Sequence, residues 1–485
     1  MGSPGIVDAA AYVPAMRLDR GAVFAANSWA NPALRGLASG SRSMGNWDED
    51  SITMGVEAAR RCLAGRSRDE FTRLYFASTT PPFADRQCAT VIAEALSLSD
   101  QLATADLGNS RNAGMQALCE ALRGDGPALV VAADTRRAKP GSVQELQYGH
   151  GSAALVLGNE GVVAEVVAEY RLTRDFVDQF RGSGEDFDYR WEERWVRDRG
   201  LRSIVPGLVR GVLKKAGVAP GQLARLVLPA APPRMTGAMA KALGLPPEAV
   251  QDGRLGDVGD TGAPHPLLLT VDALAASMPG DLVLVIGFAQ GGIALLLKAT
   301  ENLPQWQRRN ARRLALSPPR PEKAYTKYLS FSGLLPMDFG MRAEAEAKTQ
   351  LSAFDRHRAE LTGFAGGRCP VCKTAQFPRS ARCVNPDCNA EGEQELVLLA
   401  DEPGTVTSFT QDWLAYTPHP PLQYGLASTD SGARVLMEFT ECPLKQMRVG
   451  LPLRFVFRIH AIDPKRGYRR YFWKGAPAPS EESAS

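Results

Sequence analysis

Four closely spaced cysteines near the end of the chain constrain its fold more than any other feature. Cys369 and Cys372 form a C-x2-C pair, and after a gap of ten residues Cys383 and Cys388 form a C-x4-C pair. Two such pairs can place four thiolates around one tetrahedral ion, which is the arrangement of a small zinc ribbon. A closed four-sulfur site has no open position for chemistry, so the spacing predicts a structural Zn²⁺.

Length and composition set the broad class of the protein. With 485 residues, the chain is long enough for two or more domains. It is 44% hydrophobic and 22% charged, as soluble globular proteins are, and its net charge of +3 gives no sign of nucleic-acid binding. The first residues lack the pattern of a signal peptide, and the remaining four cysteines are scattered singly. We therefore expect a cytoplasmic protein with no membrane association.

Residues 1–300 alternate short apolar runs with Ala-rich helical segments. This alternation predicts an α/β architecture, although no strong internal sequence repeat is visible. The expected strands are Leu74–Ala77, Ala128–Ala132, Ala153–Leu157, Leu226–Leu228 and Leu282–Gly287. The expected helices are Ile52–Leu63, Ala89–Ala95, Ala113–Leu122, Ile204–Ala216 and Leu267–Ala276. The apolar stretch Leu282–Leu297 is broken by Gly291 and Gly292, which indicates two buried strands and not a membrane span.

The composition changes after residue 300. Residues 301–360 are expected to be a linker, with an arginine cluster, a Pro-rich patch and a helix over Met341–Arg358. The arginines Arg308, Arg309, Arg312 and Arg313 could touch phosphate, but a solvated or packed face of a connecting segment is the favoured interpretation. The ribbon is expected over residues 361–395 and a disordered Pro/Ser/Glu-rich tail over residues 476–485.

Residues 396–475 have a β pattern. The expected strands are Gly404–Thr410, Tyr424–Ser428, Ala433–Phe439 and Leu453–Ile462, with a hairpin turn at Thr429–Gly432. Several short strands in so small a region favour a closed all-β barrel such as an OB-fold.

Two resemblances to known families follow from particular residues. The C-terminal part resembles the zinc-ribbon OB-fold proteins that accompany thiolases, in its four cysteines, in Phe377-Pro378-Arg379 and in Gly404-Thr405-Val406. The first 300 residues resemble the hydroxymethylglutaryl-CoA synthase branch of the thiolase superfamily. The matching stretches are Asn46–Ser51, Ala77–Pro82, Asp134-Thr135-Arg136, Gly149–Gly158 and Gly259–Gly262.

The resemblance implies a fold and a class of ligand. The expected fold is a duplicated, five-layered thiolase-like domain, followed by the zinc ribbon and the OB-fold barrel. Coenzyme A thioesters are the expected substrate or ligand, and a homodimer through the thiolase-like domain is expected by analogy. In this family the OB module is associated with linking catalytic subunits and with lining the CoA channel.

The catalytic residues of that family are replaced in this sequence. The resemblance implies a cysteine at the start of a buried helix, where the helix dipole lowers its pKa, but Arg111 occupies that position. Thr79 stands at the position of the family glutamate, Pro229 at that of the histidine and Asp260 at that of the asparagine. A guanidinium cannot be a nucleophile. We therefore predict that Arg111 fills and neutralises the acyl-cysteine pocket.

Several other residues could take part in the vestigial site. A buried Arg111 needs a paired carboxylate, and Asp106 and Asp260 are the candidate partners. His265 lies near the expected site, where a structural role is favoured. Structural roles are favoured for the remaining candidates: Cys119 and Cys88 as buried side chains, and His150 as a turn residue.

Three functions remain open on the sequence. The first is an acyl-CoA-binding, non-nucleophilic subunit that works with a separate catalytic thiolase, whose docking and CoA guidance depend on the OB module. The second is an autonomous condensing or retro-aldol enzyme with Asp260 or His265 as base. The third and least favoured is nucleic-acid binding through basic and aromatic residues near the end of the chain, namely Arg454, Arg458, Lys465, Arg466, Tyr468, Arg469, Arg470, Tyr471, Phe472 and Trp473.

Overall fold

A computed structural model describes residues 3–229, 233–339, 344 and 348–479. The chain divides into two compact units. The first comprises Met1–Asn46, Asp50–Ala89 and Ser99–Ser332, and the second comprises Trp47–Glu49, Thr90–Leu98 and Gly333–Ser485. Within the described ranges, no helix combines the length and the apolar character needed to cross a membrane.

A nine-stranded mixed sheet forms the centre of the first unit, in the order β11-β12-β13-β8-β1-β7-β6-β4-β5. Every strand that the sequence predicts in this region is present, and three strands of the sheet, β1, β5 and β8, were not anticipated. The bounds are β1 Gly5–Tyr12, β4 Arg73–Ala77, β5 Ala103–Leu107, β6 Ala128–Thr135, β7 His150–Gly158, β8 Ala164–Thr173, β11 Leu223–Val227, β12 Leu282–Ala289 and β13 Gly291–Ala299. The last two form the expected buried hairpin.

The sheet contains the same topology twice. In the first half, β4 is parallel to both β5 and β6, while β7 is antiparallel to β6 and to β1. In the second half, β11 is parallel to β12, while β13 is antiparallel to β12 and to β8. A parallel bridge between Leu226 and Val250 stands where the counterpart of β5 would lie. The structure thus shows a duplication for which the sequence contains no recognisable repeat.

The helices repeat in the same order between the strands. The first half contains α2 (Ser51–Leu63), α3 (Cys88–Ala95) and α4 (Ala113–Arg123), and the second contains α7 (Arg202–Ala216), α8 (Pro233–Ala242) and α9 (His265–Ala275). The bounds of five of these helices agree with the sequence prediction to within two residues, and α8 was not predicted.

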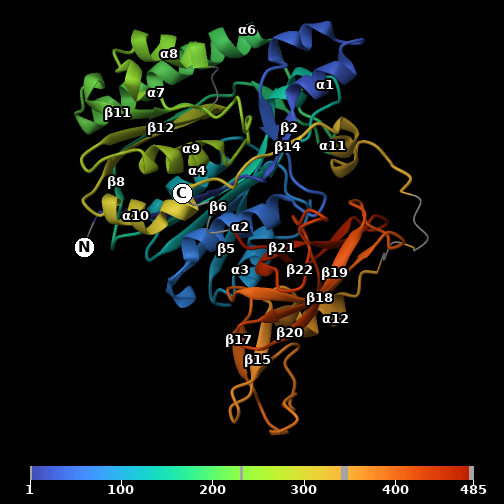
Figure 1. Ribbon diagram of the computed structural model, residues 1–485. Coiled ribbons are helices and arrows are strands. Elements are labelled where there is room, and N and C mark those ends of the chain that lie inside the picture. The colour runs from blue at the N-terminus through green and yellow to red at the C-terminus, as the bar shows by residue number, and fades with distance from the viewer. Residues whose placement is uncertain (1–2, 230–232, 340–343, 345–347, 480–485) are drawn as a thin grey trace. The chain divides into compact units, whose positions relative to one another are not determined.

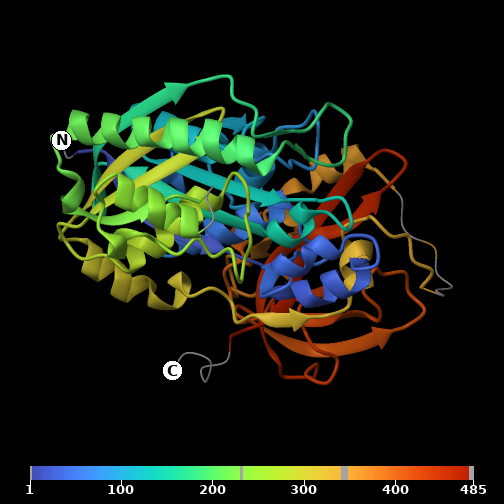
Figure 2. The same cartoon turned by 90° about the horizontal axis from the view of Figure 1, so that it is seen from above.

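These helices and strands form five layers. α2 covers the outer face of β1, β6 and β7, while α4 and α9 pack against each other in the middle (Figure 1). α7 covers β8 and β13 on the opposite outer face, where it lies along β8, with Gly207 against Leu172 and Gly211 against Tyr170 (Figure 2). Apolar residues of the strands alternate between two buried clusters, one around α4 and α9 and one around α7. The N-termini of the two middle helices are thereby brought to one place.

Residues 301–332 correct the expectation of a linker, because they pack within the first unit. They form α10 (Leu303–Leu314), β14 (Arg320–Glu322) and α11 (Tyr325–Phe331), and β14 pairs with β2 (Met16–Asp19). On α10, the buried Trp306 donates its indole N–H to Asp8 at 2.7 Å. Arg309 pairs with the same carboxylate at 3.1 Å. Part of the arginine cluster therefore anchors a helix to β1.

Smaller elements complete the first unit. A three-stranded sheet joins β14, β2 and β3 (Ser41–Ser43), and a short hairpin joins β9 (Gln179–Phe180) to β10 (Tyr189–Arg190). The remaining helices are α1 (Arg20–Asn27), α5 (Val143–Gln147) and α6 (Glu193–Trp195).

A five-stranded antiparallel sheet forms the main body of the second unit, in the order β20-β19-β18-β21-β22. The bounds are β18 Gly404–Asp412, β19 Leu422–Thr429, β20 Arg434–Glu438, β21 Pro452–Asp463 and β22 Tyr468–Pro477. A parallel bridge from Phe439 to Gly475 joins the two edge strands of this sheet. The four predicted strands are present, and this closure is compatible with an OB-like barrel.

Turn chemistry explains one connection of this sheet. Between β19 and β20, Gly432 adopts a φ of +95° and its N–H donates to the carbonyl of Thr429 at 3.0 Å. Glycine tolerates this backbone conformation without strain, so the predicted hairpin turn forms where the sequence places it.

Two expectations for the second unit need correction. The predicted helix over Met341–Arg358 is shorter, because the described part contains only α12 (Leu351–Arg356), followed by α13 (Arg358–Leu361); residues 341–343 and 345–347 lie outside the described residues. Ala476 and Pro477, expected in the tail, belong to β22, and residues 480–485 lie outside the described residues.

The cysteine-rich segment contains a small sheet of its own. Its strands have the order β16-β15-β17, with bounds of Ala365–Arg368 for β15, Ala375–Gln376 for β16 and Glu395–Leu398 for β17.

Candidate functional site

The N-termini of α4 and α9 meet without room for side chains between them. A Cβ atom on Gly114 would lie 2.3 Å from the carbonyl oxygen of Ala263. Only glycine permits this approach. Arg111 and Asp260, which belong to the segments that lead into the two helices, therefore lie together at one end of the middle layer.

Arg111 is held by two carboxylates. Its guanidinium pairs with Asp178 and lies 3.4 Å from Asp260. The Asp178 side chain is only 2% exposed and that of Arg111 is 17% exposed. Of the two partners expected from the sequence, Asp260 is confirmed. Asp106 is not a partner, because its carboxylate accepts from the backbone N–H groups of Cys88 and Ala89 at the start of α3.

A second arginine, Arg136, extends the network. It pairs with Asp260 at 2.7 Å and with Asp188 at 3.2 Å, and its guanidinium carbon lies 3.3 Å from the centre of the Tyr148 ring. Arg181 pairs with the other oxygen of Asp188 at 2.8 Å. The six ions are Arg111, Arg136, Arg181, Asp178, Asp188 and Asp260. Three positive and three negative charges balance, so this network is neutral without a ligand.

The network fixes the protonation state of Asp260. Burial by itself would raise the pKa of this carboxyl, but Arg136 and Arg111 hold it well below its usual range. The pKa of Arg111 is raised in spite of burial, because Asp178 and Asp260 favour the charged guanidinium. Asp260 is therefore a weak base at neutral pH.

Thr79 lies in a hydrogen-bonded loop around Asp134. Its hydroxyl and its N–H donate to Asp134 at 2.9 and 2.7 Å, and Ala263 donates to the same carboxylate at 2.8 Å. The carbonyl of Thr79 accepts from Arg181, which connects this loop to the ionic network. Thr79 thus tethers the end of β4 to the segments that carry Asp134 and Ala263. Pro229 lies in a buried turn after β11.

His265 has both ring nitrogens engaged. The backbone N–H of Thr261 donates to Nδ1 at 3.2 Å, so the proton resides on Nε2, which donates to the Gly253 carbonyl at 3.1 Å. Burial lowers the pKa of His265. This geometry holds the N-terminus of α9 and leaves no ring nitrogen for proton transfer.

His150 corrects a sequence expectation, because it begins strand β7 and is not a turn residue. Its Nδ1 accepts from the N–H of Gly45 at 2.8 Å, and Nε2 lies 3.2 Å from the carbonyl of Arg136. Burial lowers its pKa to about 3, so the ring is neutral.

The cysteines of the first unit do not supply a reactive thiolate. Cys119 lies buried on α4 and Cys88 lies buried at the start of α3. Burial raises the pKa of each thiol to about 12. Since the thiolate is the nucleophilic form of cysteine, neither residue is an effective nucleophile at neutral pH.

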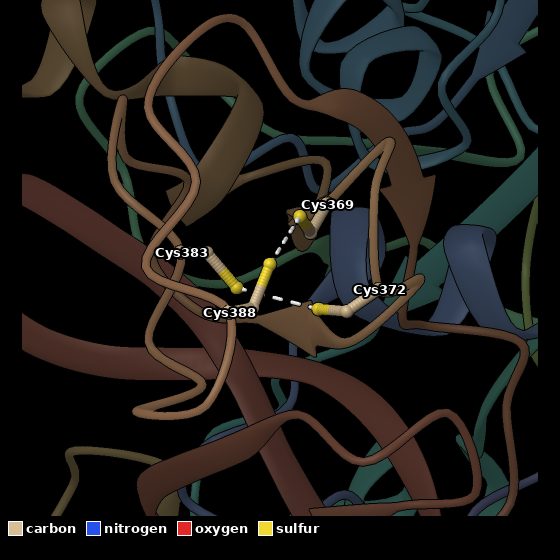
Figure 3. A group of neighbouring side chains, drawn as sticks. All are labelled: Cys369, Cys372, Cys383 and Cys388. Atoms are coloured by element: carbon tan, nitrogen blue, oxygen red, sulfur yellow. Dashed lines mark hydrogen bonds between the residues drawn. The ribbon is translucent and has the colours of Figure 1, made fainter.

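The four cysteines of the second unit converge on one point (Figure 3). All four sulfur atoms lie within 4.8 Å of one another, with Cys372 and Cys383 at 3.5 Å and Cys369 and Cys388 at 3.9 Å. Zn–S bonds of about 2.3 Å in a tetrahedron require S···S separations of about 3.8 Å. The donor set and its spacing therefore fit a tetrahedral Zn²⁺.

Half of the ionic network could not be predicted from the sequence. Asp178, Arg181 and Asp188 all come from the excursion between β8 and α7 that contains the β9–β10 hairpin. Their positions follow no motif, and they lie far from Arg111 along the chain. The available signal was the charge of a buried Arg111, which required more than one carboxylate.

Comparisons with known proteins agree with this fold. A scan against models of protein families finds no match. The chain is 29% identical over 321 residues to the hydroxymethylglutaryl-CoA synthase of Pyrobaculum aerophilum. This match covers 64% of this chain and 91% of that protein. It is 30% identical over 298 residues to the hydroxymethylglutaryl-CoA synthase of Aeropyrum pernix, which covers 60% of this chain and 82% of that protein.

Solved structures share the architecture at lower identity. An HMG-CoA synthase complexed with CoA matches with a TM-score of 0.59 at 14% identity, over 72% of this chain and 92% of that chain. The 3-oxoacyl-(acyl carrier protein) synthase III of Pseudomonas aeruginosa matches with a TM-score of 0.55 at 21% identity, over 61% of this chain and 98% of that chain. These likenesses establish a thiolase-like α/β fold. By its identity to these relatives across most of their length, the chain belongs to the hydroxymethylglutaryl-CoA synthase family of the thiolase superfamily.

Proposed function

We propose that this chain binds an acyl-CoA and acts as a synthase-like subunit without a nucleophile, together with a separate catalytic thiolase. The complex would form or cleave C–C bonds on acyl-CoA. The names of the relatives support CoA thioesters as the ligand class. The observation that carries the proposal is Arg111 at the start of α4, neutralised by Asp178 and Asp260.

The ionic network argues against chemistry within this chain alone. A thiolate at this position would attack an acyl thioester, whereas the guanidinium of Arg111 stays protonated. The network fills the position with charges that satisfy one another. The two cysteines nearby in sequence, Cys88 and Cys119, have pKa values of about 12.

The alternative function, an autonomous retro-aldol or condensing enzyme, is less well supported, because neither of its candidate bases, Asp260 and His265, is suited to proton transfer. The pKa of Asp260 is held low by two arginines, and His265 uses both of its ring nitrogens in hydrogen bonds. A general base works best with a pKa near the operating pH and within reach of substrate.

Nucleic-acid binding is also disfavoured by the placement of the basic and aromatic residues. Trp473 and Arg458 are fully buried, and Tyr471 is nearly so. Arg454 and Arg458 pair with Glu441 at 2.7 and 2.6 Å. Binding of single strands needs exposed aromatic faces and available cations, and these four residues do not provide them; of the set named from the sequence, Lys465 and Arg466 are exposed.

We further propose that the four cysteines hold a structural Zn²⁺ and that the ribbon and the OB-like barrel form a module that docks the catalytic partner and guides CoA. Two positive-φ residues, Lys373 and Asn389, shape the turns after the cysteine pairs. Lys373 donates its N–H to the carbonyl of Cys369 at 3.0 Å, as expected for a metal-binding knuckle. A homodimer through the first unit is part of the same proposal.

Metal content tests the zinc assignment. We expect one Zn²⁺ per chain by elemental analysis, and its loss in a Cys369→Ser variant. Cys442→Ser is the matched control, because Cys442 is a buried cysteine of the same unit outside the cluster, and it should keep its metal. Full metal content in the Cys369→Ser variant would contradict the assignment.

Reconstitution with a cysteine-bearing thiolase tests the proposed division of labour. We expect no turnover of acyl-CoA by this chain alone, and turnover after mixing with the partner. Intact-mass spectrometry after incubation with acetyl-CoA should show acylation of the partner and none of this chain. Stable acylation of the isolated chain, or its turnover without a partner, would sink the proposal.

A further inference from the structure

A cavity of about 460 Å³ opens in the second unit, beside the barrel. Its walls come from strands β19, β20, β21 and β22 and from α12 and α13. This size lies within the range of small-molecule sites in proteins. The apolar part of its lining consists of Phe354, Leu361, Leu422, Tyr424, Leu436, Met437, Tyr471, Phe472 and Trp473.

Four ionisable side chains complete the lining: Glu438, His460, Arg470 and Lys474. Glu438 lies between two of them, because one oxygen is 3.2 Å from Nδ1 of His460 and the other is 2.8 Å from Nζ of Lys474. Burial by itself would raise the pKa of Glu438, but Lys474 and His460 lower it to about 2. The carboxylate is therefore ionised and orients the imidazole, so that Nδ1 donates and Nε2 remains for another partner.

The backbone presents His460 in an unusual way. The pairing of β21 with β22 shifts register between Ile459 and Ala461, which leaves His460 at a β-bulge. Bulges redirect a side chain and occur frequently beside binding and catalytic sites. The side chain of His460 is 37% exposed, although its Nδ1 is fixed by Glu438. An imidazole that is held in one orientation at the wall of an apolar cavity is more typical of a ligand-binding site than of a hydrophobic core.

We propose that this cavity binds an apolar carboxylic acid, with its acid group at Nε2 of His460 and beside Arg470. Nε2 of His460 can accept the acid proton, and Arg470 is a cation of the same lining, so a carboxyl head group fits this end of the cavity. The carboxyl group and Nε2 share one proton in the complex. At roughly 30 Å³ per non-hydrogen atom, the volume of a water molecule in the liquid, the cavity holds about fifteen such atoms. The ligand is therefore a medium-length chain or a compact ring system.

This site is separate from the Arg111 network, because all of its lining belongs to the second unit. It does not depend on the proposed function, since no catalytic partner and no CoA are needed to fill it. The two proposals can therefore fail independently.

Binding of three matched amphiphiles to the full chain tests this inference. Decanoate, decanol and decylamine share one chain length and differ in head group. We expect saturable binding of one decanoate per chain by calorimetry, with decanol weaker by about tenfold, as for one lost charge-assisted hydrogen bond. Decylamine should bind more weakly still. Equal affinity for the three, or no saturable binding of decanoate, would overturn the proposal.

Two variants and one control locate the site. His460→Gln should weaken decanoate about tenfold and leave decanol unchanged, since only the acid group meets Nε2. Met437→Trp should weaken both ligands by filling the cavity while keeping the Glu438–His460 pair. His357→Gln changes a histidine of the same unit that does not line the cavity, and it should bind as the unchanged chain does.

Labelled-histidine NMR provides a readout that is independent of affinity. The imidazole nitrogen signals of His460, identified by their absence in His460→Gln, should shift with decanoate and not with decanol. Unchanged signals at saturating decanoate would place the ligand elsewhere and overturn the assignment.

Discussion

The buried ionic network of the first unit is built around a single side chain, Arg111. Arg111 occupies the helix start where a thiolate would be favoured, and its cation is disfavoured there by the helix dipole. The structure compensates with Asp178 and Asp260, and a second arginine then requires Asp188. Removing one partner of a buried ion pair leaves the other charge uncompensated, so the network should be sensitive to single substitutions and tolerant of paired ones.

A double-mutant cycle measures this coupling. Arg111→Ala should lower the free energy of unfolding by about 3 kcal/mol, because the nearly buried Asp178 loses its cation. In an Asp178→Asn background, the same substitution should cost at least about 1 kcal/mol less. The measurement is urea unfolding of the four chains.

The control cycle uses Arg197 and Asp198, a pair with side chains 35% and 42% exposed. Its coupling should be much weaker than that of the Arg111–Asp178 pair, because solvent screens an exposed pair. Additive effects of Arg111→Ala and Asp178→Asn would show that this pair is not coupled.

His150 makes the first unit sensitive to acid. Its pKa in the folded chain is about 3, below the ordinary value of 6.5, because burial disfavours the charged ring. Between these two pH values the unfolded chain binds more protons, so stability is full above pH 6.5 and falls as the pH drops towards 3. The loss from this residue should be about 2 kcal/mol between pH 7 and pH 5.

The matched measurement is urea unfolding at several pH values. His150→Gln should flatten the pH dependence over this range by roughly that amount, whatever its effect at pH 7. His357→Gln should not, because the side chain of His357 is 59% exposed. The same slope in His150→Gln and the unchanged chain would contradict the prediction.

At the scale of elements, sequence periodicity predicts the long helices and the buried strands. It locates α2, α4, α7 and α9 and the β12–β13 hairpin, because their apolar residues repeat with a clear period. It misses β8, whose partly exposed strand has a weak pattern, and it misses the duplication, which is a property of topology. It also takes α10 for linker, because a helix rich in arginine looks solvated until its partners are known.

The candidate site divides in the same way. The four cysteine ligands follow from spacing alone, since metal geometry fixes how far apart the ligands can lie. Arg111 and Asp260 follow from family motifs. The partners Asp178 and Asp188 depend on how the excursion after β8 folds back, and no local rule predicts that.

The anchor of α10 provides a test at this scale. Trp306→Phe keeps the aromatic packing and removes the hydrogen bond to Asp8, a carboxylate only 2% exposed. Loss of one donor to a buried carboxylate should destabilise the first unit by about 1–3 kcal/mol in urea unfolding. Trp29→Phe is the control, because Trp29 is 87% exposed and should change little. If Trp306→Phe were as stable as the unchanged chain, the hydrogen bond from Trp306 to Asp8 would not anchor α10.

At the scale of the whole molecule, the second unit contains residues from both ends of the chain. Asp48 and Glu49 lie in it beside two buried cations: Lys474 is 3.1 Å from Asp48, and Arg458 is 3.3 Å from Glu49. The Lys474 ammonium also lies 4.4 Å from the centre of the Trp47 ring. Strands β21 and β22 therefore depend on three residues that precede them by most of the chain.

An Asp48→Asn variant tests this dependence. The amide keeps the shape and loses the charge, so the buried Lys474 is undercompensated and the second unit should lose about 3 kcal/mol. Hydrogen exchange of the backbone amides of β21 and β22 should speed up accordingly. Glu395→Gln, a carboxylate 59% exposed in the same unit, should leave the exchange unchanged. Protection equal to that of the unchanged chain would mean that Asp48 contributes nothing.

These long-range pairs also have a consequence for folding during synthesis, because the two residues of each pair are synthesised far apart in time. Asp8 and its partner Trp306 are separated by 298 residues along the chain, and Asp48 and its partner Lys474 are separated by 426 residues. At a translation rate of about 5–20 residues per second, Lys474 is synthesised on the order of 20–90 s after Asp48. Each unit therefore contains an acidic residue that is synthesised early and that gains one of its partners in the folded chain only late in synthesis.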